Sequence, residues 1–359
     1  MSQQTASVRM TFIGALYWGS TTRQRLEAFR QLPALDVQAV DSEANIDREP
    51  GLVGLWHRGR SKLGYPADRY RECARLIAAA EQHRPDVVFV DASRVLTRGT
   101  LRKVRAIGDP TLVYYIPDDV MARHNQTRQR VATMRDWDIF FTTKTFNVPE
   151  LAAHGVREPT LIGNSFDPAL HRPMTPADVG PEYEQFDVVF VGSYEGERCD
   201  SVNALAEAGI NVIVFGSDWP RRQLDARVQL REGVYAEEYS RCMHFGKVAL
   251  NFLRKINRDR ITTRSIEVPA MARPVVGERS DEHDAHFVDG TEYLGFSSDR
   301  ELVAHVKRLL ADDVFRRNLA LAGRQRCLAS GYSTLDRAQE MMNKIIEVRS
   351  RTTSRTVHA

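Results

Sequence analysis

Basic side chains crowd the start of one short predicted helix in the segment Val248–Gly277, between two apolar strands. Arg260 and Arg264 lie beside or within its first turn, where the positive end of the helix dipole disfavours cationic side chains. A phosphate group docked among the first helix N–H groups would relieve that repulsion. Glu267 follows Arg264 by three residues and shares its helix face, where a carboxylate can accept hydrogen bonds from sugar hydroxyls. The pattern predicts a site for a nucleotide or a nucleotide sugar.

A second interpretation of the same segment needs no ligand. Asp259 and Glu267 would neutralise the arginines in a surface network of ion pairs, which contributes little stability. Either Thr262 or Thr263 is expected to act as the N-cap of the helix. The local pattern leaves both interpretations open.

Residues at other strand ends are weaker candidates for the same site. A glycine there lets the backbone approach phosphate oxygens, although a strand-glycine-serine corner is usually an ordinary turn. Gly19 and Ser20, after the first strand, have two interpretations: a loop that faces the donor phosphates, or a plain helix N-cap. The candidates are Gly192, Ser193 and Arg198 around one predicted strand end, Gly216 at the next, and Gly19 and Ser20 after the first strand.

Two adjacent carboxylates, Asp118 and Asp119, follow the predicted strand 111–116. A carboxylate at a strand end can deprotonate an acceptor hydroxyl, which makes this pair the candidate general base. The alternative is a turn and an N-cap, since Pro-Asp-Asp is strong turn chemistry. His124 is a weaker candidate. The other isolated histidines considered are expected on the surface: His57, His171 and His283.

Apolar strands alternate along the chain with segments of helical periodicity. This alternation is typical of parallel sheets covered by helices, and such a scaffold must position the candidate side chains. The first half predicts strands at 10–17, 35–40, 86–91, 111–116, 138–143 and 159–163, and helices at 21–32, 67–83 and 97–107. The second half predicts strands at 187–193, 211–216, 248–253 and one ending near 277, and helices at 200–207, 236–243, 300–310, 314–330 and 334–348. We therefore expect an α/β fold with two Rossmann-like domains and a ligand cleft at the carboxyl ends of their strands.

Composition restricts the class of protein. A chain of 359 residues with 42% hydrophobic and 27% charged residues is typical of a soluble protein of two domains. No apolar run approaches the roughly 20 residues that span a bilayer, and no secretion signal is evident, so a cytoplasmic location is expected. Four scattered cysteines lack the spacing of a zinc site or a disulfide framework.

The net charge of +3 is unevenly divided along the chain. Residues 1–175 hold 24 Lys and Arg against 19 Asp and Glu, an excess of +5. This mild excess favours an anionic acceptor or peripheral association with the inner membrane face. It is too dispersed for nucleic acid, which requires a clustered basic stripe.

A proline-rich stretch at 165–185, without apolar periodicity, is predicted to be a linker between the halves. The predicted domains are residues 1–175 and 176–335, followed by a helix at 336–350. The tail at 351–359 is predicted to be disordered.

The run Arg264-Ser-Ile-Glu267-Val-Pro-Ala-Met-Ala-Arg-Pro274-Val-Val resembles the pattern R-x-[FI]-E-[IV]-x-A-x-G-x-P of the glycosyltransferase group 1 family, in its CgeB-like (spore-protein-related) branch. Downstream, an acidic segment, a Phe-x-Asp-Gly turn, a strand and two helices ending in Ala-Gly-x-x-Arg are similar to the same family. The resemblance covers about residues 187–342. It is looser in the first half, where PDDV at 117–120 and DPALHRP in the linker are similar to family members.

This resemblance implies a GT-B fold, with the acceptor on the first domain, the donor on the second, and the C-terminal helix crossing back to the first. Glu267 is implied to bind the donor ribose, and Tyr235 to lie where the nucleobase passes, although an ordinary half-buried tyrosine is the alternative. We assign the diphosphate to Arg260 and Arg264, because a metal-independent transferase needs fixed positive charge at the leaving group. Thr263 is a further candidate for donor binding.

Two positions depart from the family pattern. Arg273 or its neighbour Ala272 stands where the family has glycine, so the turn after the helix must form without one. Asp259, a shorter carboxylate, stands where the wider retaining group has the first of two glutamates.

We therefore expect an enzyme without cofactor or metal that moves a sugar from a nucleoside-diphosphate sugar to an acceptor hydroxyl. The acceptor is a glycan, a lipid-linked molecule or a small molecule, in surface-polysaccharide or glycoconjugate biosynthesis. The pattern does not distinguish retention from inversion. Two rival hypotheses stay open: a nucleotide-sugar epimerase of the same fold, and a non-catalytic GT-B-like binding or structural protein.

Overall fold

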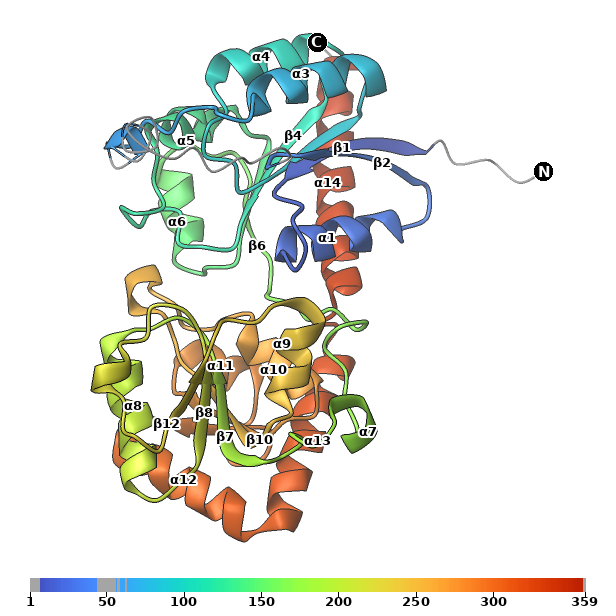
Figure 1. Cartoon of the computed structure of the whole chain (residues 1–359). Helices are drawn as coiled ribbons and strands as arrows, with labels where there is room; N and C mark the ends of the chain where they lie inside the picture. Colours follow the sequence, from blue (N-terminus) through green and yellow to red (C-terminus); the bar gives the residue numbers. More distant parts are fainter. Residues whose placement is uncertain (1–6, 44–55, 57–58, 62, 358–359) are drawn as a thin grey trace, which may run out of the picture. The chain divides into compact units, whose positions relative to one another are not determined.

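The chain forms two compact units, each a parallel sheet wrapped by helices (Figure 1). The computed structural model describes residues 7–43, 56, 59–61 and 63–357, with side chains through 351. Unit 1 comprises the chain up to Gly163 together with the segment from Leu335 onward, and unit 2 runs from Asn164 to Thr334. The division thus falls after residue 163, whereas the sequence analysis drew it after residue 175.

Unit 1 is built on a six-stranded parallel sheet of order β2-β1-β3-β4-β5-β6. Alternate side chains of its buried strands pack against α1 and α14 on one face and against α3 and α4 on the other. This two-sided burial explains why the strands are continuous apolar runs. The elements are β1 (Val8–Gly14), α1 (Thr21–Arg30), β2 (Leu35–Asp41), α3 (Glu72–His83), β3 (Val87–Asp91), α4 (Arg98–Ala106), β4 (Thr111–Ile116), α5 (Arg128–Thr133), β5 (Ile139–Thr142), α6 (Asn147–Ala153), β6 (Pro159–Leu161) and α14 (Thr334–Val357).

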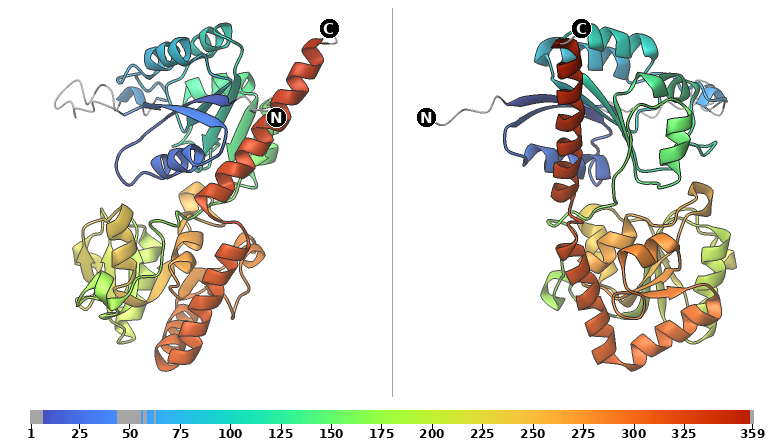
Figure 2. Two further views of the ribbon diagram at one scale, coloured as in Figure 1. Left: turned by 90° about the vertical axis from the view of Figure 1, so that its right-hand side faces the viewer. Right: turned by 180° about the vertical axis from the view of Figure 1, so that it is seen from behind.

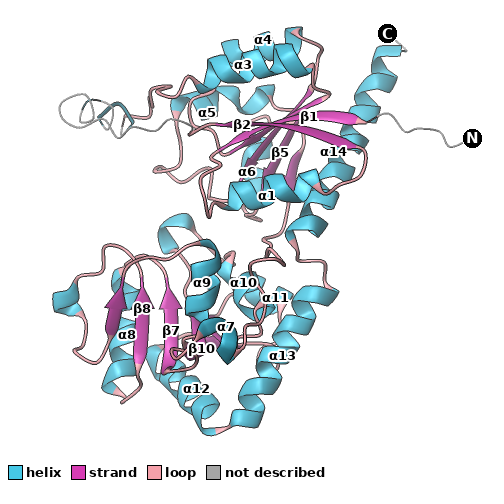
Figure 3. Ribbon diagram, turned by 45° about the vertical axis from the view of Figure 1, so that its right-hand side comes forward, coloured by secondary structure: helices cyan, strands magenta, loops and turns pink. Residues whose placement is uncertain are grey.

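Unit 2 repeats the architecture with the strand order β12-β11-β10-β7-β8-β9 (strands magenta in Figure 3). Its elements are α7 (Pro176–Val179), β7 (Phe186–Val191), α8 (Gly196–Glu207), β8 (Val212–Phe215), β9 (Gln229–Arg231), α9 (Ala236–Met243), β10 (Gly246–Asn251), α10 (Arg264–Ala270), β11 (Val275–Glu278), α11 (Asp281–His286), β12 (Leu294–Phe296), α12 (Asp299–Ala311) and α13 (Asp313–Ala329). The predicted α/β class with two Rossmann-like domains is confirmed.

Each sheet reverses its strand order once. In unit 1 the chain leaves β1 for β2 on one side and returns to β3 on the other, and in unit 2 β7 lies between β8 and β10 in the same way. Ligands of open parallel sheets bind outside the carboxyl ends of the strands at such a reversal. The loops after β1, β3, β7 and β10 are therefore the places to look for a site.

Helix α14 belongs to unit 1 and lies along its sheet in both views of Figure 2. Its buried side chains join the cluster formed by β1, β3 and α1, and Arg349 Nη2 lies 2.8 Å from the Asp86 carboxylate. Those side chains are Ala338, Met341, Met342, Ile345 and Val348. The prediction of a disordered tail is wrong as far as Val357, because the helix continues to that residue.

The stretch predicted as a linker is instead packed onto unit 2. Phe166, Met174 and Val179 are buried in its core. Thr175 caps the short helix α7 through a capping box with Asp178, and the Pro176 ring suits the first helical position. This packing was not predicted, because the stretch contains four prolines and consists of short turns, which have no periodic apolar pattern.

Short elements were generally missed by the sequence analysis, among them α5, α6, α11 and β9. The start predicted at 67 for α3 is also wrong, since the helix begins at Glu72. The Asp68 carboxylate accepts hydrogen bonds from the N–H groups of Glu72 and Cys73, and Arg71 adopts a left-handed φ of 53°. His57 lies outside the described residues.

Glu72 is a buried acidic residue of unit 1. Burial raises the pKa of its carboxyl group to about 7, with a hydrogen bond from Ser93 opposing the shift and the charge of Asp68 adding to it. Folding therefore favours the protonated carboxyl group. The associated stability is fully present below the ordinary pKa of 4.5 and is lost as the pH rises through 7.

We expect Glu72→Gln to be more stable than the wild type at pH 8 by about 3 kcal/mol, with the difference shrinking toward pH 4.5. Urea unfolding at several pH values, followed by hydrogen exchange of unit 1 peptides, measures it. Glu81→Gln, an exposed change on the same helix, is the control. A difference that does not vary with pH would contradict the assignment.

Adjacent residues of α14 test its packing. Ile345 is 0% exposed and Ile346 is 50% exposed. We expect Ile345→Ala to destabilise unit 1 by about 2–5 kcal/mol, because it leaves a cavity. Ile346→Ala should change stability by less than about 0.5 kcal/mol. If the two substitutions changed the hydrogen exchange of unit 1 equally, the packing of Ile345 against the sheet would be contradicted.

Candidate functional site

Helix α10 follows the carboxyl end of β10 and carries the residues predicted to bind the donor. Thr263 occupies its N-cap position, but neither predicted threonine caps it: Thr263 makes no side-chain capping bond, and Thr262 donates its hydroxyl to Asn251 Oδ1 at 3.1 Å. The N–H groups of Ser265, Ile266 and Glu267 donate to the carbonyls of Thr262 and Thr263. Fewer helix N–H groups are therefore available to bind a phosphate than the sequence predicted. The positive charge at this helix start comes from arginine side chains instead.

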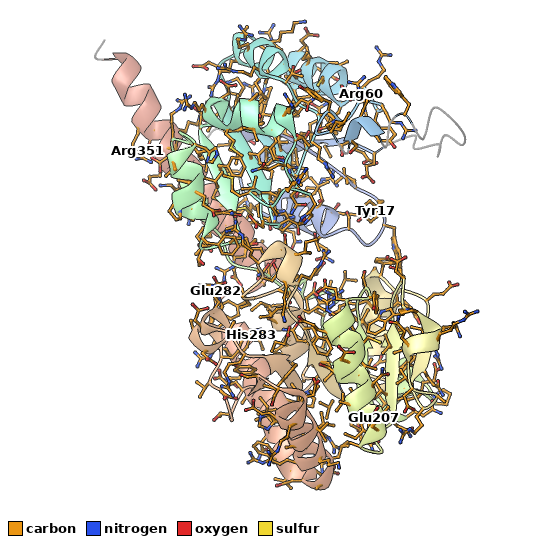
Figure 4. All side chains as sticks on the ribbon, turned by 90° about the vertical axis from the view of Figure 1, so that its left-hand side faces the viewer. Tyr17, Arg60, Glu207, Glu282, His283 and Arg351 are labelled. Carbon is orange, nitrogen blue, oxygen red and sulfur yellow. The ribbon has the colours of Figure 1, made fainter. Side chains whose placement is uncertain are left out.

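A buried polar network fixes the start of α10. Asn251 Nδ2 donates to Ser265 Oγ at 2.8 Å, and His283 Nε2 lies 2.6 Å from the same oxygen. His283, on α11, is labelled in Figure 4. It is buried rather than on the surface as predicted, and burial lowers the pKa of its imidazole. The network ties β10, α10 and α11 together.

The far end of α10 is held by α13. A side chain at Gly323 would lie 3.2 Å from Pro269 and 2.7 Å from the Glu292 carbonyl, so only glycine permits this close approach. Arg324 donates to the Ala270 carbonyl. The close approach explains the glycine of the Ala-Gly-x-x-Arg pattern, and the arginine of that pattern, Arg326, pairs with Glu292 at 3.0 Å.

The turn after α10 forms without glycine, as the sequence required. Ala272 adopts a left-handed φ of 55°. Arg273 is buried and donates to Glu184 at 3.0 Å and to the Gly246 carbonyl at 2.5 Å. The side chain that replaces the family's glycine therefore has a structural role in unit 2.

Two guanidinium groups converge at the carboxyl edge of this sheet. Burial lowers the pKa of the Arg198 guanidinium, and the negative charge of Glu195 partly offsets that shift. The positive charges of Arg264 and Arg254 lower the pKa further. Arg198 Nη1 donates to the Ser193 carbonyl at 3.0 Å, and its Nη2 lies 3.4 Å from the Glu195 carboxylate. The Nε atoms of Arg198 and Arg264 are both buried and have no hydrogen-bond partner within the described part of the chain. Arginines in this state are prepared to bind an anion.

Three basic residues of the loop between β10 and α10 pair with acids: Arg254, Lys255 and Arg260. Arg260 Nη1 lies 2.8 Å from Asp281 in a pair whose side chains are 50% and 66% exposed, which matches the surface interpretation for this arginine. Arg254 Nε lies 3.3 Å from Glu195, and Lys255 pairs with Glu197. Arg260, predicted to bind the diphosphate together with Arg264, is therefore paired with a surface carboxylate.

Glu267 is only 6% exposed and has two buried aromatic neighbours. His171 Nε2 lies 3.6 Å from its Oε1. Burial raises the pKa of Tyr239 well above its ordinary value, and the negative charge of Glu267 raises it further. The Tyr239 hydroxyl has no hydrogen bond of good geometry among the described residues. His171 was predicted to be on the surface, and it is 2% exposed.

The glycines after β7 and β8 lie against each other. A Cβ on Gly216 would lie 1.9 Å from the Gly192 carbonyl oxygen, which also accepts a hydrogen bond from Trp219 Nε1 at 2.8 Å. Gly233 lies close to Gly216 and to the hydroxyl of Tyr235, which is 62% exposed. The predicted Gly192, Gly216 and Tyr235 therefore share one edge of the sheet, with Ser193 exposed beside them.

In unit 1, Gly19 and Ser20 form the turn before α1. Gly19 has a φ of 86°, and Ser20 Oγ accepts from the N–H of Arg23 at 3.1 Å while donating to the Ala15 carbonyl. Ser20 is therefore an N-cap, the plainer of the two interpretations.

A buried ion pair lies at the same edge of the unit 1 sheet. Arg25 Nε lies 2.8 Å from Asp91, and its guanidinium covers the Tyr115 ring at 3.8 Å. Next to it, a side chain at Gly14 would lie 2.6 Å from Thr22. The pair was not predicted from the sequence, because its members are 66 residues apart.

The two candidate carboxylates after β4 differ in their surroundings. Asp119 is fully buried, and its Oδ1 accepts from the N–H of Met121 at 3.0 Å and from Asn147 at 2.9 Å, which favours the turn interpretation. Asp118 is half-buried. His124 is exposed.

Two exposed aromatic residues follow β1, Tyr17 and Trp18, at 55% and 63% exposure. Tyr17 was predicted to lie in the first strand, but that strand ends earlier, at Gly14. The turn-forming Gly19 directly after Tyr17 and Trp18 was the sequence signal that these two residues lie in a loop.

Among the residues described, no group of three or more His, Cys, Asp or Glu side chains comes together in the manner of metal ligands. Likewise, no helix within the described ranges is long and apolar enough to cross a bilayer.

Comparison with known families matches residues 198–343 to the family described as glycosyl transferase-like. The matched segment begins at Arg198 and includes α10 and α13. No curated protein matches the chain.

Comparison with solved structures finds similar proteins over nearly the whole chain. Sucrose-phosphate synthase from Thermosynechococcus elongatus has a TM-score of 0.65 at 13% identity, covering 96% of this chain and 100% of that one. HepE of Anabaena in complex with UDP-glucose has a TM-score of 0.64 at 13% identity, covering 94% and 99%. A glycosyltransferase from Rickettsia africae has a TM-score of 0.61 at 10% identity, covering 95% and 98%. The chain therefore has the GT-B fold, and the matched segment supports the glycosyltransferase class predicted from its sequence.

Proposed function

We propose that the protein transfers a sugar from a nucleoside-diphosphate sugar, held by unit 2, to an acceptor hydroxyl. The observation that carries this proposal is the pair of arginines at the carboxyl edge of the second sheet. Arg198 and Arg264 each keep a buried Nε without a partner among the described residues. Arg198 Nη2 lies 3.4 Å from the Glu195 carboxylate, so one carboxylate already faces two guanidinium groups. A diphosphate leaving group supplies further negative charge and acceptors for the two Nε–H groups.

The residues around the arginine pair fit the remaining parts of a nucleotide. Glu267 lies three residues after Arg264 on α10, where its carboxylate suits ribose hydroxyls. Tyr235 is exposed beside Gly216 and offers a face or an edge to the nucleobase. We propose UDP as the nucleotide, since the Anabaena protein of the same fold binds UDP-glucose.

The acceptor side of the proposal is assigned to unit 1. Trp18 is exposed after β1, and aromatic rings of this kind pack against sugar rings. Asp118 is the remaining candidate base, because Asp119 is occupied within its turn. The basic excess of residues 1–175 supports an acceptor that is anionic or attached to an anionic membrane face.

The resemblance of Arg264–Pro274 to the CgeB-like branch supports a role in surface-polysaccharide or glycoconjugate assembly. Metal-independent transfer is part of the proposal, since the arginines supply the positive charge at the leaving group.

Nucleotide binding tests the donor site. UDP at 100 times its dissociation constant should stabilise the wild type by about 2.7 kcal/mol in a thermal-shift assay, more than GDP, dTDP or CDP at the same concentration. Arg264→Ala and Glu267→Ala should each weaken UDP binding roughly tenfold or more in titration calorimetry.

Arg260→Ala is the matched control, because this neighbouring arginine already pairs with Asp281 on the surface. It should bind UDP within roughly twofold of the wild type. If the wild type bound none of the four nucleotides at millimolar concentration, the donor site and the proposed activity would both be rejected, which would favour a non-catalytic protein.

A second experiment separates transfer from epimerisation. Incubated with UDP-glucose or UDP-N-acetylglucosamine and no acceptor, a transferase should leave the sugar configuration unchanged by NMR. An altered sugar formed under those conditions would instead identify an epimerase.

A further inference from the structure

His171 is a buried histidine that faces the proposed ribose-binding carboxylate. We infer that it is a positioning residue, which orients Glu267 for the ribose hydroxyls of the donor. This inference rests on the proposed function and extends it to a residue 96 positions away in the chain. Its basis is the orientation of the imidazole ring, the rigidity of the turn that carries it, and the burial of Glu267.

The hydrogen bonds of the ring determine which nitrogen faces Glu267. The N–H of Asp167 donates to His171 Nδ1 at 2.9 Å, so Nδ1 is an acceptor and carries no proton. In the neutral ring the proton then lies on Nε2. Nε2 is the atom that lies 3.6 Å from Glu267 Oε1. The imidazole therefore directs an N–H group at the carboxylate.

The turn that carries His171 is anchored at several points within unit 2. His171 N donates to the Asp167 carbonyl at 2.7 Å, and Ala169 N donates to the Asp167 carboxylate at 2.9 Å. The preceding Phe166 is buried and bridges to the end of the unit, since its N–H donates to the Tyr332 carbonyl and its carbonyl accepts from Thr334. This anchoring holds the ring in place.

Packing restricts the ring further. The Tyr239 ring meets His171 edge-on, with centroids 5.8 Å apart and planes at 82°. Both side chains lie beside Glu267. A carboxylate that is 6% exposed depends on the few polar groups directed at it, because burial of an unpaired charge is costly. Without the Nε2–H group, Glu267 would turn toward the cationic Arg264 on its own helix face and lose its orientation for ribose.

Two substitutions separate the contact with Glu267 from the contact that stabilises the turn. Asparagine places an amide oxygen near the position of Nδ1, so His171→Asn retains the acceptor for Asp167 N–H but does not reach Glu267. Glutamine places its amide nitrogen near the position of Nε2, so His171→Gln retains a donor toward Glu267. If the histidine were only structural, these two variants would show no opposite effects on ribose recognition.

The experiment measures ribose discrimination by titration calorimetry of the full-length chain with UDP and with 2′,3′-dideoxyuridine 5′-diphosphate. The wild type should bind UDP roughly tenfold more tightly than the dideoxy analogue. In His171→Asn the two affinities should come within roughly twofold of each other, and His171→Gln should recover most of the discrimination. Combining His171→Asn with Glu267→Ala should lower UDP affinity no further than Glu267→Ala alone, because one residue acts through the other.

A matched control is His244→Gln. His244 is also buried in unit 2, and its Nε2 accepts from the N–H of Met174 in the same connecting segment. Its Nδ1 lies 2.8 Å from the Ser240 carbonyl, so the described hydrogen bonds of this ring lead away from Glu267. This variant should lose thermal stability and keep the wild-type discrimination.

The possible failures are distinguishable. If His171→Asn discriminated against the dideoxy analogue as the wild type does, the positioning role would be overturned and the donor site would stand. If the wild type bound both nucleotides equally, the ribose role of Glu267 would fall together with that of His171. If the wild type bound neither nucleotide, the proposed donor site itself would be overturned.

Discussion

The burial of α10 is the constraint on which the candidate donor site depends. A helix of seven residues is too short to be stable on its own, so its position is set entirely by the elements around it. Asn251, Ser265 and His283 hold its first turn, and Gly323 and Arg324 hold its end. Because both ends are fixed, Arg264 and Glu267 project from a rigid support, which is what the recognition of one ligand by two side chains requires.

Ion pairing then divides the basic residues around the start of α10 into two kinds. Arg254, Lys255 and Arg260 reach carboxylates, and exposed pairs of this sort contribute little to stability. Arg198 also lies 3.4 Å from Glu195, but Arg198 and Arg264 each keep a buried Nε for which no partner is found among the described residues. A buried polar group without a partner is costly, and that cost is the physical argument for an anion beside these two Nε atoms.

Much of the fold was predictable because its strands are buried on both faces. Runs such as Val87–Asp91 and Thr111–Ile116 are continuous and apolar, and the observed strands fall on them. Short elements were not predictable in the same way. Helix α11 reads as an acidic segment, and the packed stretch from Phe166 to Val179 reads as a proline-rich linker, since neither is long enough for a periodic pattern to emerge.

The sequence by itself determined the relation between Arg264 and Glu267, because two residues three apart on a helix share a face whatever surrounds them. It also determined that the turn after α10 forms without glycine, and Ala272 adopts the left-handed backbone this requires. Only the tertiary structure decided that Arg260 pairs with Asp281 and that His171, expected at the surface, lies buried against Glu267. Those contacts join residues far apart in the chain, and no local spacing encodes them, since they exist only when packing brings the segments together.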